Sequence, residues 1–264
     1  MEFVFVVPRR ALFPECYPQG FLPFDEHGSA DRAAFDRAIA EHGFFVERAR
    51  AEREPEWKQV IPYSVVWQPP AVANGEGHVL LLVRSARGGD ARLHHKMSIG
   101  VGGHVNPVDA VAGSGNPVAA GSRREIDEEL CIDGATETRA VGLINDDSNA
   151  VGAVHVGLVQ VLCVAPGTRI AVREEDVLEG RMVTLLELED LAGGDSGRGD
   201  SGRGDSGRGD SGRGDSGRGD LGRGDLGRRG ANLESWSRLL VPHLARLVGT
   251  TAALPAGDRA SSLS

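Results

Sequence analysis

The sequence predicts a layered domain of the α/β (α+β) class, and three observations lead to this prediction. Four segments rich in β-branched residues are separated by clusters of Gly, Pro, Asn or Asp, which is the pattern of strands joined by turns. Segments with apolar residues at helical spacing are interspersed with them. The chain has 264 residues, of which 40% are hydrophobic, so it can bury a sizeable core.

Each element is expected at a particular place along the chain. Strands are predicted over residues 60–67, 78–84, 138–144 and 154–164. Helices are predicted over residues 30–40, 118–131 and 233–248, and in the segment LLELEDL that follows Val183. Because strands and helices are interspersed, we expect the helices to pack against a sheet.

Residues 193–230 form a pentapeptide repeat in which SGRGD occurs five times before LGRGD and LGRRG. Glycine fills two positions of each pentad and apolar residues are almost absent, so ordering this segment would cost backbone entropy without burying a core. We expect a disordered insertion before the C-terminal helix of a single domain that spans residues 1–264. The RGD tripeptide is similar to a cell-adhesion motif, but an expanded repeat in an exposed loop is the simpler interpretation because no export signal is recognised.

The charge balance and the cysteines narrow the choice of partner and compartment. Lys and Arg total 29 against 38 Asp and Glu, and this acidic balance disfavours unspecific binding to nucleic acid or to an anionic membrane. The three cysteines are too few and too scattered for a disulfide framework or a CxxC zinc site. The apolar run at residues 3–7 is too short for a membrane anchor and lacks the basic flank of a signal peptide. We therefore expect a cytoplasmic protein.

A cluster of glutamates on a predicted helix is the strongest indication of chemistry. Glu125, Glu128 and Glu129 fall on one face of that helix at 100° per residue. Like charges this close repel each other unless a cation lies among them, and carboxylate oxygens suit Mg²⁺ or Mn²⁺ better than zinc. Arg124 can pair with Glu128 one turn away, and Gly103 permits a close backbone approach to a metal or a phosphate. The alternative is a solvated acidic helix face with an internal ion pair.

The pattern resembles the Nudix box, Gly-x5-Glu-x7-Arg-Glu-U-x-Glu-Glu-x-Gly-U, in which U is a bulky aliphatic residue. The matching residues are Gly103, Arg124, Glu125, Ile126, Glu128, Glu129 and Ile132. Asp109 stands where the family has its first glutamate, and fourteen residues instead of seven separate it from Arg124, so the box holds a seven-residue insertion within residues 110–117. We expect this insertion to border the substrate cleft. Cys131 replaces the last glycine, and the segments GxGGHxN and RExxEEL are similar to a branch of predicted phosphoesterases in the Nudix superfamily.

The resemblance implies a Nudix-type α/β/α sandwich with a mixed β-sheet. It implies that Glu125, Glu128, Glu129 and the carbonyl of Gly103 bind Mg²⁺ or Mn²⁺, and that Arg124 holds the glutamates in place. Arg124, Glu128 and Glu129 are then the expected catalytic residues. Bound metal would bridge the oxygens of a diphosphate and orient an attacking water. The implied reaction is hydrolysis of a phosphoanhydride bond in a nucleoside diphosphate linked to another group, so the expected partner is a small nucleotide.

Several basic residues near the glycine turn are candidates for contacts with the phosphates of the substrate: His95, Lys96 and His104. A histidine near a turn is more often a structural hydrogen-bonding residue than a ligand-binding one. A glutamate from a later loop can serve as general base, and that loop contains Glu174, Glu175 and Glu179.

The three tryptophans, Trp57, Trp67 and Trp236, could stack on a nucleobase, although packing in the core or at its rim is the more frequent role of tryptophan.

Two rival interpretations share the box with a hydrolase. An isopentenyl-diphosphate isomerase resembles this fold and metal use, but it needs a catalytic cysteine near the start of the box, and no cysteine lies between Cys16 and Cys131. A non-catalytic nucleotide-sensing module would keep the box as a ligand cleft, against which the intact glutamates argue. The sequence leaves open the substrate, the general base, the role of Asp109 and the oligomeric state, with a homodimer among the options.

Overall fold

The computed structural model describes residues 1–24, 30–84, 96–112, 115–173, 178–193 and 233–249. His95, Glu174 and Glu175 lie outside these ranges, and so does the pentapeptide repeat beyond Gly193. The expectations for these residues stay predictions.

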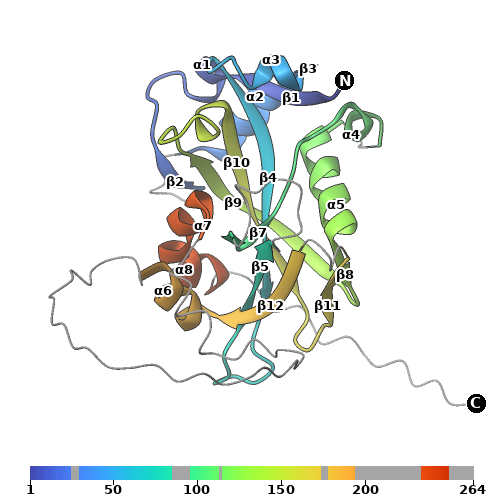
Figure 1. Cartoon of the computed structure of the whole chain (residues 1–264), viewed down its shortest axis with the longest axis vertical. Helices are drawn as coiled ribbons and strands as arrows, with labels where there is room; N and C mark the ends of the chain where they lie inside the picture. Colours follow the sequence, from blue (N-terminus) through green and yellow to red (C-terminus); the bar gives the residue numbers. More distant parts are fainter. Residues whose placement is uncertain (25–29, 85–95, 113–114, 174–177, 194–232, 250–264) are drawn as a thin grey trace, which may run out of the picture.

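A large mixed β-sheet forms the centre of the protein (Figure 1). Its main path contains β12 (Leu178–Thr184), β5 (His78–Arg84), β4 (Trp57–Gln68), β10 (His155–Val164), β9 (Thr136–Asn145) and β2 (Gly20–Pro23), in that order. β10 runs parallel to β4, whereas the other neighbours along the path are antiparallel. The four strands predicted from the sequence are the four central ones, β5, β4, β10 and β9, so the mixed α+β class is confirmed.

Short strands complete the sheet, and two of them fill a gap between β4 and β5. β1 (Phe3–Pro8) pairs with β3 (Phe44–Glu47) and with the start of β4. β4 and β5 pair only where Trp67 and Gln68 meet Val79 and His78. Beyond that point β6 (Met97–Ser98) pairs with β5, and β7 (Gly100–Val101) pairs with β4. The two central strands therefore diverge, and the segment that leads to the glycine turn fills the gap between them.

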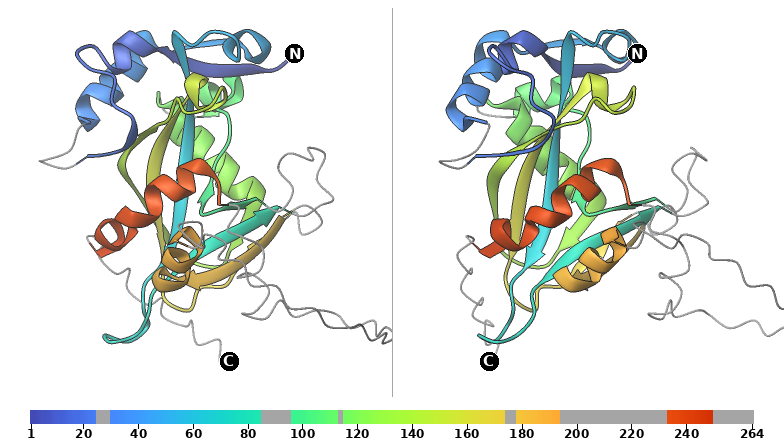
Figure 2. Two further views of the ribbon diagram at one scale, coloured as in Figure 1. Left: turned by 60° about the vertical axis from the view of Figure 1, so that its left-hand side comes forward. Right: turned by 90° about the vertical axis from the view of Figure 1, so that its left-hand side faces the viewer.

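Helices cover both faces of the sheet (Figures 1 and 2). α5 (Pro117–Glu129) lies on one face, where Ser122 Oγ donates a 2.6 Å hydrogen bond to Gln160 of β10. The small buried residues Ala120, Gly121 and Ser122 allow this close approach. α6 (Leu185–Gly193), α7 (Ser235–Leu240) and α8 (Leu244–Gly249) cover the other face. This arrangement is the predicted α/β/α sandwich.

The remaining helices are short or belong to the N-terminal part of the chain. α2 (Arg32–His42) begins at Asp31, whose carboxylate accepts hydrogen bonds from two backbone amides of the first turn. α1 (Arg9–Leu12) and α3 (Arg48–Ala51) flank β1, and α4 (Pro107–Ala112) precedes α5. Two 3-10 turns, η2 (Gly152–Val154) and η3 (Val241–His243), lead into β10 and α8.

One helix prediction was wrong at its C-terminal end, and another was wrong in its continuity. The predicted helix 118–131 ends at Glu129, because Leu130 begins β8 (Leu130–Ile132), which pairs with β11 (Ile170–Val172) and includes Cys131. The predicted helix 233–248 is divided into α7, η3 and α8. Pro242 lies at the division, where a proline lacks the amide that a continuous helix requires. Leu233 itself forms a β-bridge with Met97.

The core consists of several apolar clusters that hold these layers together. The largest lies between the sheet and the helices α6 to α8, and includes Val65, Leu81, Leu188, Leu240 and Leu244. No helix in the described part of the chain is long and apolar enough to cross a membrane.

Candidate active site

Arg124 is the centre of an ion-pair network at the middle of α5. Its Nη1 donates to Glu125 Oε1 at 2.8 Å and to Glu128 Oε2 at 3.0 Å. Its Nη2 donates to the carbonyl of His104 at 2.9 Å, which ties the helix to the glycine turn. The contact with Glu128 one turn away is the one that the helical spacing predicts. The guanidinium is therefore the cation that offsets the repulsion between these carboxylates in the protein alone.

Asp109 anchors Arg124 from the opposite side. Its carboxylate accepts two hydrogen bonds from the guanidinium, Nε to Oδ1 at 2.9 Å and Nη2 to Oδ2 at 3.0 Å. A third comes from the backbone amide of Asn106 at 2.8 Å. Asp109 is nearly fully buried, and its hydrogen bonds are the main cause that raises the pKa of Arg124. The aspartate at the position of the family's first glutamate thus positions the arginine of the box.

Gly103 lies directly against the carboxylate of Glu125. A side chain at position 103 would overlap that carboxylate, and one at Gly102 would overlap the carbonyl of Pro62. Burial raises the pKa of Glu125, and the hydrogen bond and positive charge of Arg124 oppose this rise. A side chain at position 103 would therefore have to displace the carboxylate of Glu125, whose charge Arg124 compensates in part.

The side chains of the α5 glutamates have the chemistry that a divalent cation requires, but they are not arranged around a common metal position. Glu125, Glu128 and Glu129 offer hard carboxylate oxygens on one helix, with that of Glu125 beside Gly103, and Mg²⁺ and Mn²⁺ prefer such ligands. Within the described ranges, no three acidic, histidine or cysteine side chains are already placed to hold a metal ion. Glu125 and Glu128 both form ion pairs with Arg124.

A pocket of about 160 Å³ opens beside the last glutamate of α5, at the place where β4 and β5 diverge. Its lining includes Gly102 and Glu129 together with Tyr63, Trp236, Glu234 and Arg84. Aliphatic side chains from β4, β5 and β12 complete the lining. The box helix and the C-terminal segment before α7 therefore share one cavity, although more than 100 residues separate them in the sequence.

The comparisons with known proteins agree with this geometry. The chain is 34% identical over 192 residues to the protein YmaB of Bacillus subtilis (strain 168), a match that covers 71% of this chain and 88% of YmaB. It superposes with a TM-score of 0.61 on the crystal structure of Tm1382, a protein assigned to the Nudix hydrolases, at 25% identity and over 93% of this chain and all of Tm1382. The chain belongs to the Nudix superfamily. No family model matches the sequence.

Membership in the Nudix superfamily confirms the enzyme class that the sequence predicts, a Nudix hydrolase, and supports an activity of the pyrophosphohydrolase type. The assignment of Gly103, Arg124 and the α5 glutamates to the Nudix box stays a prediction.

The described residues of the seven-residue insertion lie apart from the pocket. Residues 107–112 form α4, which packs against α5 and β1. None of the described residues between Asn106 and Pro117 lines the pocket, which lies at the other end of α5 beside Glu129. The expectation that the insertion borders the substrate cleft stays a prediction.

His104 lies apart from the pocket and faces another histidine. Its Nε2 is 3.4 Å from Nε2 of His155, whose Nδ1 lies 2.6 Å from the carbonyl of Val151. Since a carbonyl only accepts, Nδ1 of His155 carries the proton and its Nε2 accepts from His104. Burial lowers the pKa of His104 to about 4 and also lowers the pKa of His155. A neutral, buried histidine is a structural hydrogen-bonding residue and supplies no positive charge for a phosphate.

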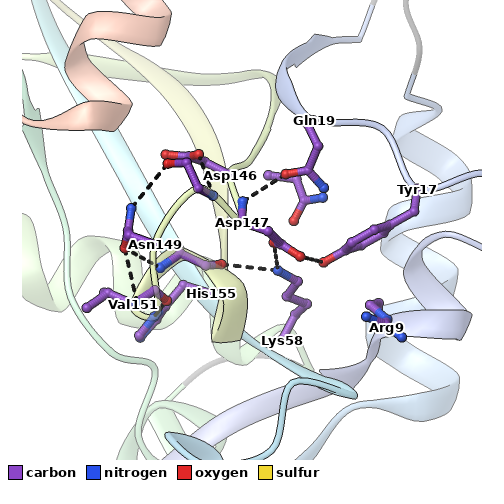
Figure 3. Close-up of polar contacts among 12 residues, drawn as sticks. Arg9, Tyr17, Gln19, Lys58, Asp146, Asp147, Asn149, Val151 and His155 are labelled. Carbon is purple, nitrogen blue, oxygen red and sulfur yellow. Dashed lines mark hydrogen bonds and ion pairs between the residues drawn. The ribbon is translucent and has the colours of Figure 1, made fainter.

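A second polar cluster links the N-terminal segment to the loop before β10 (Figure 3). The fully buried side chain of Lys58 donates to Asp147 Oδ1 at 2.7 Å and to the carbonyl of Gly152 at 3.1 Å. The hydroxyl of Tyr17 donates to Asp147 Oδ2 at 2.8 Å. Burial raises the pKa of Tyr17 to about 12 and lowers that of Lys58, while Asp147 opposes the change at Lys58. The cluster contributes no residue to the pocket lining. It anchors the loop between β9 and β10.

The other predicted residues occupy different places. Lys96 is half-buried, and its positive charge acts on Glu234 of the pocket. Glu179 is exposed on β12. Trp57 packs edge-on against Phe44, and Trp67 belongs to the core. Of the three tryptophans, Trp236 lines the pocket.

Sequence reasoning missed Glu234 and Arg84 as pocket residues. They lie far from the box in the sequence, and a pattern within one segment cannot show which distant segments meet.

Proposed function

We propose that the protein is a Mg²⁺- or Mn²⁺-dependent hydrolase that cleaves a phosphoanhydride bond in a nucleoside diphosphate linked to another group. The observation that carries this proposal is the half-buried carboxylate of Glu125 against Gly103, with Glu128 on the same helix and Glu129 at the wall of the pocket. Burial disfavours a charged carboxylate, and a divalent cation is the partner that compensates several of them together.

Glu125, Glu128, Glu129 and the carbonyl of Gly103 would hold the metal. When bound, the metal supplies charge neutralisation for the diphosphate and lowers the pKa of the attacking water. Glu129 lines the pocket and so stands between the box and the substrate.

Arg124 acts through the glutamates in this proposal. Asp109 and the His104 carbonyl hold its guanidinium on one side, and it holds Glu125 and Glu128 on the other. It thereby keeps two like-charged carboxylates close together before any metal arrives. This role needs a fixed arginine, which explains the buried bidentate contact with Asp109.

The proposed cellular compartment and oligomeric state rest on the sequence. All three cysteines are free, which is the state that a reducing compartment maintains, and we propose a cytoplasmic enzyme that acts on a small-molecule diphosphate. A homodimer is compatible with this proposal.

A release assay tests the proposed function. The purified protein is given nucleoside triphosphates, nucleotide sugars, dinucleoside polyphosphates, ADP-ribose and coenzyme A derivatives with Mg²⁺ or Mn²⁺, and the release of phosphate or of a phosphomonoester is measured. We expect turnover of at least one class, and its loss with EDTA. Isomerisation of isopentenyl diphosphate, or binding of nucleotides without turnover, would instead favour one of the two rivals.

Glu128→Gln provides the matched variant for that assay. We expect turnover to fall at least about 100-fold, because one ligand charge is lost while the amide keeps the shape of the side chain. Asp127→Asn is the control, since Asp127 is exposed on the same helix one residue away. Equal activity of the Glu128→Gln variant and the parent would contradict the metal site.

A further inference from the structure

Three residues that line the pocket, Trp236, Tyr63 and Glu234, have no part in the proposed chemistry. We propose that they bind a nucleobase that presents two adjacent N–H donors, as guanine does, with Glu234 accepting both and Trp236 stacking on the ring. This inference rests on the proposed function, because it places the base of the substrate whose diphosphate lies at Glu129.

The indole of Trp236 is held in place by two neighbours. Its ring meets Tyr63 edge-on, with centroids 5.6 Å apart and an interplanar angle of 80°. The strand β10 also has a glycine, Gly157, next to the ring, where an added Cβ would lie 2.9 Å from the indole. Tyr63 is itself fixed, because its hydroxyl lies 2.7 Å from Ser237 Oγ and 3.1 Å from Ser98 Oγ. A half-buried, oriented aromatic ring in a pocket is suited to stack on a planar base.

Glu234 is placed as rigidly as the indole. Its backbone amide donates to the carbonyl of Met97 at 2.9 Å, and its own carbonyl accepts from Arg238 in the first turn of α7. Burial raises the pKa of its carboxyl, and the charges of Arg84 and Lys96 and a hydrogen bond with Ser98 favour the ionised form. When it is ionised, a carboxylate that is partly withdrawn from water is a strong acceptor for a pair of N–H donors.

The carboxylate also determines which bases are excluded. Guanine presents N1–H and its 2-amino group side by side, so both can donate to one carboxylate. Adenine places an acceptor beside its amino group, and that acceptor would face the charged oxygens of Glu234. Hypoxanthine keeps one donor and lacks the second. Gly102 and Glu129 line the same pocket, so the diphosphate is placed beside these two residues and the base beside Glu234 and Trp236.

Binding of nucleosides tests this inference without metal or turnover. Guanosine, inosine and adenosine are titrated in EDTA, and binding is followed by quenching of tryptophan fluorescence. We expect guanosine to bind at least about tenfold more tightly than inosine or adenosine. Glu234→Gln should remove this difference in affinity. Trp236→Phe should weaken the binding of all three nucleosides and reduce the fluorescence quenching. Glu137→Gln, an exposed change on β9, is the control that should bind as the parent does.

The outcomes separate this inference from the proposed function. Equal or absent binding of the three nucleosides to the parent overturns the inference, whatever the variants do. If nucleotides are hydrolysed with Mg²⁺ and without preference for the base, the inference also fails while the proposed function stands. Guanosine-selective binding that Glu234 controls, with no hydrolysis of any guanine nucleotide, supports the base site and contradicts the hydrolase.

Discussion

Gly103 has no room for a side chain, and the atoms that fill its space belong to the Glu125 carboxylate. We predict that Gly103→Ala folds normally, because the flexible end of Glu125 can move aside. It should lose most of its metal affinity and turnover, since the displaced carboxylate leaves the site. Isothermal titration with Mn²⁺ and a melting curve measure the two effects. Gly193→Ala, where a Cβ meets nothing within 4 Å, is the control. Unchanged Mn²⁺ affinity would mean that Glu125 is no ligand.

His104 makes stability depend on pH in a defined window. Burial lowers its pKa from the ordinary 6.5 to about 4, so the folded protein excludes a proton that the unfolded chain accepts. The stability that the neutral histidine contributes is present above pH 6.5 and is lost as the pH falls towards 4. We predict a loss of about 3 kcal/mol across this range.

Urea unfolding at several pH values measures this loss. His104→Gln should flatten the dependence between pH 6.5 and 4, because glutamine takes up no proton. His42→Gln, a change of an exposed histidine on α2, should leave the dependence as it is. Identical pH profiles of the parent and the His104→Gln variant would show that His104 is accessible to protons in the folded state.

The sequence could predict those site residues that are related to each other by their spacing along one helix. Glu125, Glu128 and Glu129 fall on one helical face, and Arg124 reaches Glu128 across one turn, because the helix repeat fixes these relations. Glu234 and Arg84 enter the pocket through strand divergence and a β-bridge, which are relations between distant segments. A single sequence contains no signal for such contacts.

At the scale of elements, α4 and α5 act as a clamp on Arg124. The side chain of Asp109 is 3% exposed and that of Arg124 22%, so this ion pair is largely screened from water. We predict that Asp109→Ala lowers the free energy of unfolding by about 3 kcal/mol, because it leaves a poorly solvated guanidinium without its main partner. Urea denaturation measures the change.

Asp127→Ala on the exposed side of α5 is the control for Asp109→Ala and should change the free energy of unfolding by about 0.5 kcal/mol or less. Turnover should fall in Asp109→Ala as well, because Arg124 then no longer holds its glutamates. A variant with full stability and full turnover would show that the clamp has no role.

The burial of a strand explains whether it could be predicted from the sequence. β10 is buried along its whole length and β4 nearly so, which produces long β-branched runs such as residues 154–164. The strands that were missed are mostly short, such as β2, β3, β6 and β7, or belong to the edges of the sheet, such as β12. Two to four residues carry too little periodicity to be recognised, and partners elsewhere in the chain determine that they pair.

At the scale of the whole molecule, the opening between β4 and β5 joins the two halves of the candidate site. The box helix reaches it from one face of the sheet and the segment before α7 reaches it from the other. That segment resumes only after the pentapeptide repeat, so the chain must return to the sheet at Leu233, which is buried and forms a bridge with Met97. The position of Glu234 and Trp236 thus depends on the attachment of Leu233 and on the packing of α7.

Deletion of the pentapeptide repeat therefore tests whether Leu233 and α7 attach to the sheet without it. We predict that deletion of residues 196–225, six whole pentads, raises the free energy of unfolding by about 1 kcal/mol or leaves it unchanged, because the cost of closing a flexible loop grows only with the logarithm of its length. Nine residues would still connect Gly193 with Leu233. Turnover and nucleoside binding should be preserved, since Leu233, Glu234 and α7 remain. A loss of cooperativity in urea unfolding, or loss of the pocket's ligands with the fold intact, would show that the repeat orders the return of the chain to the sheet.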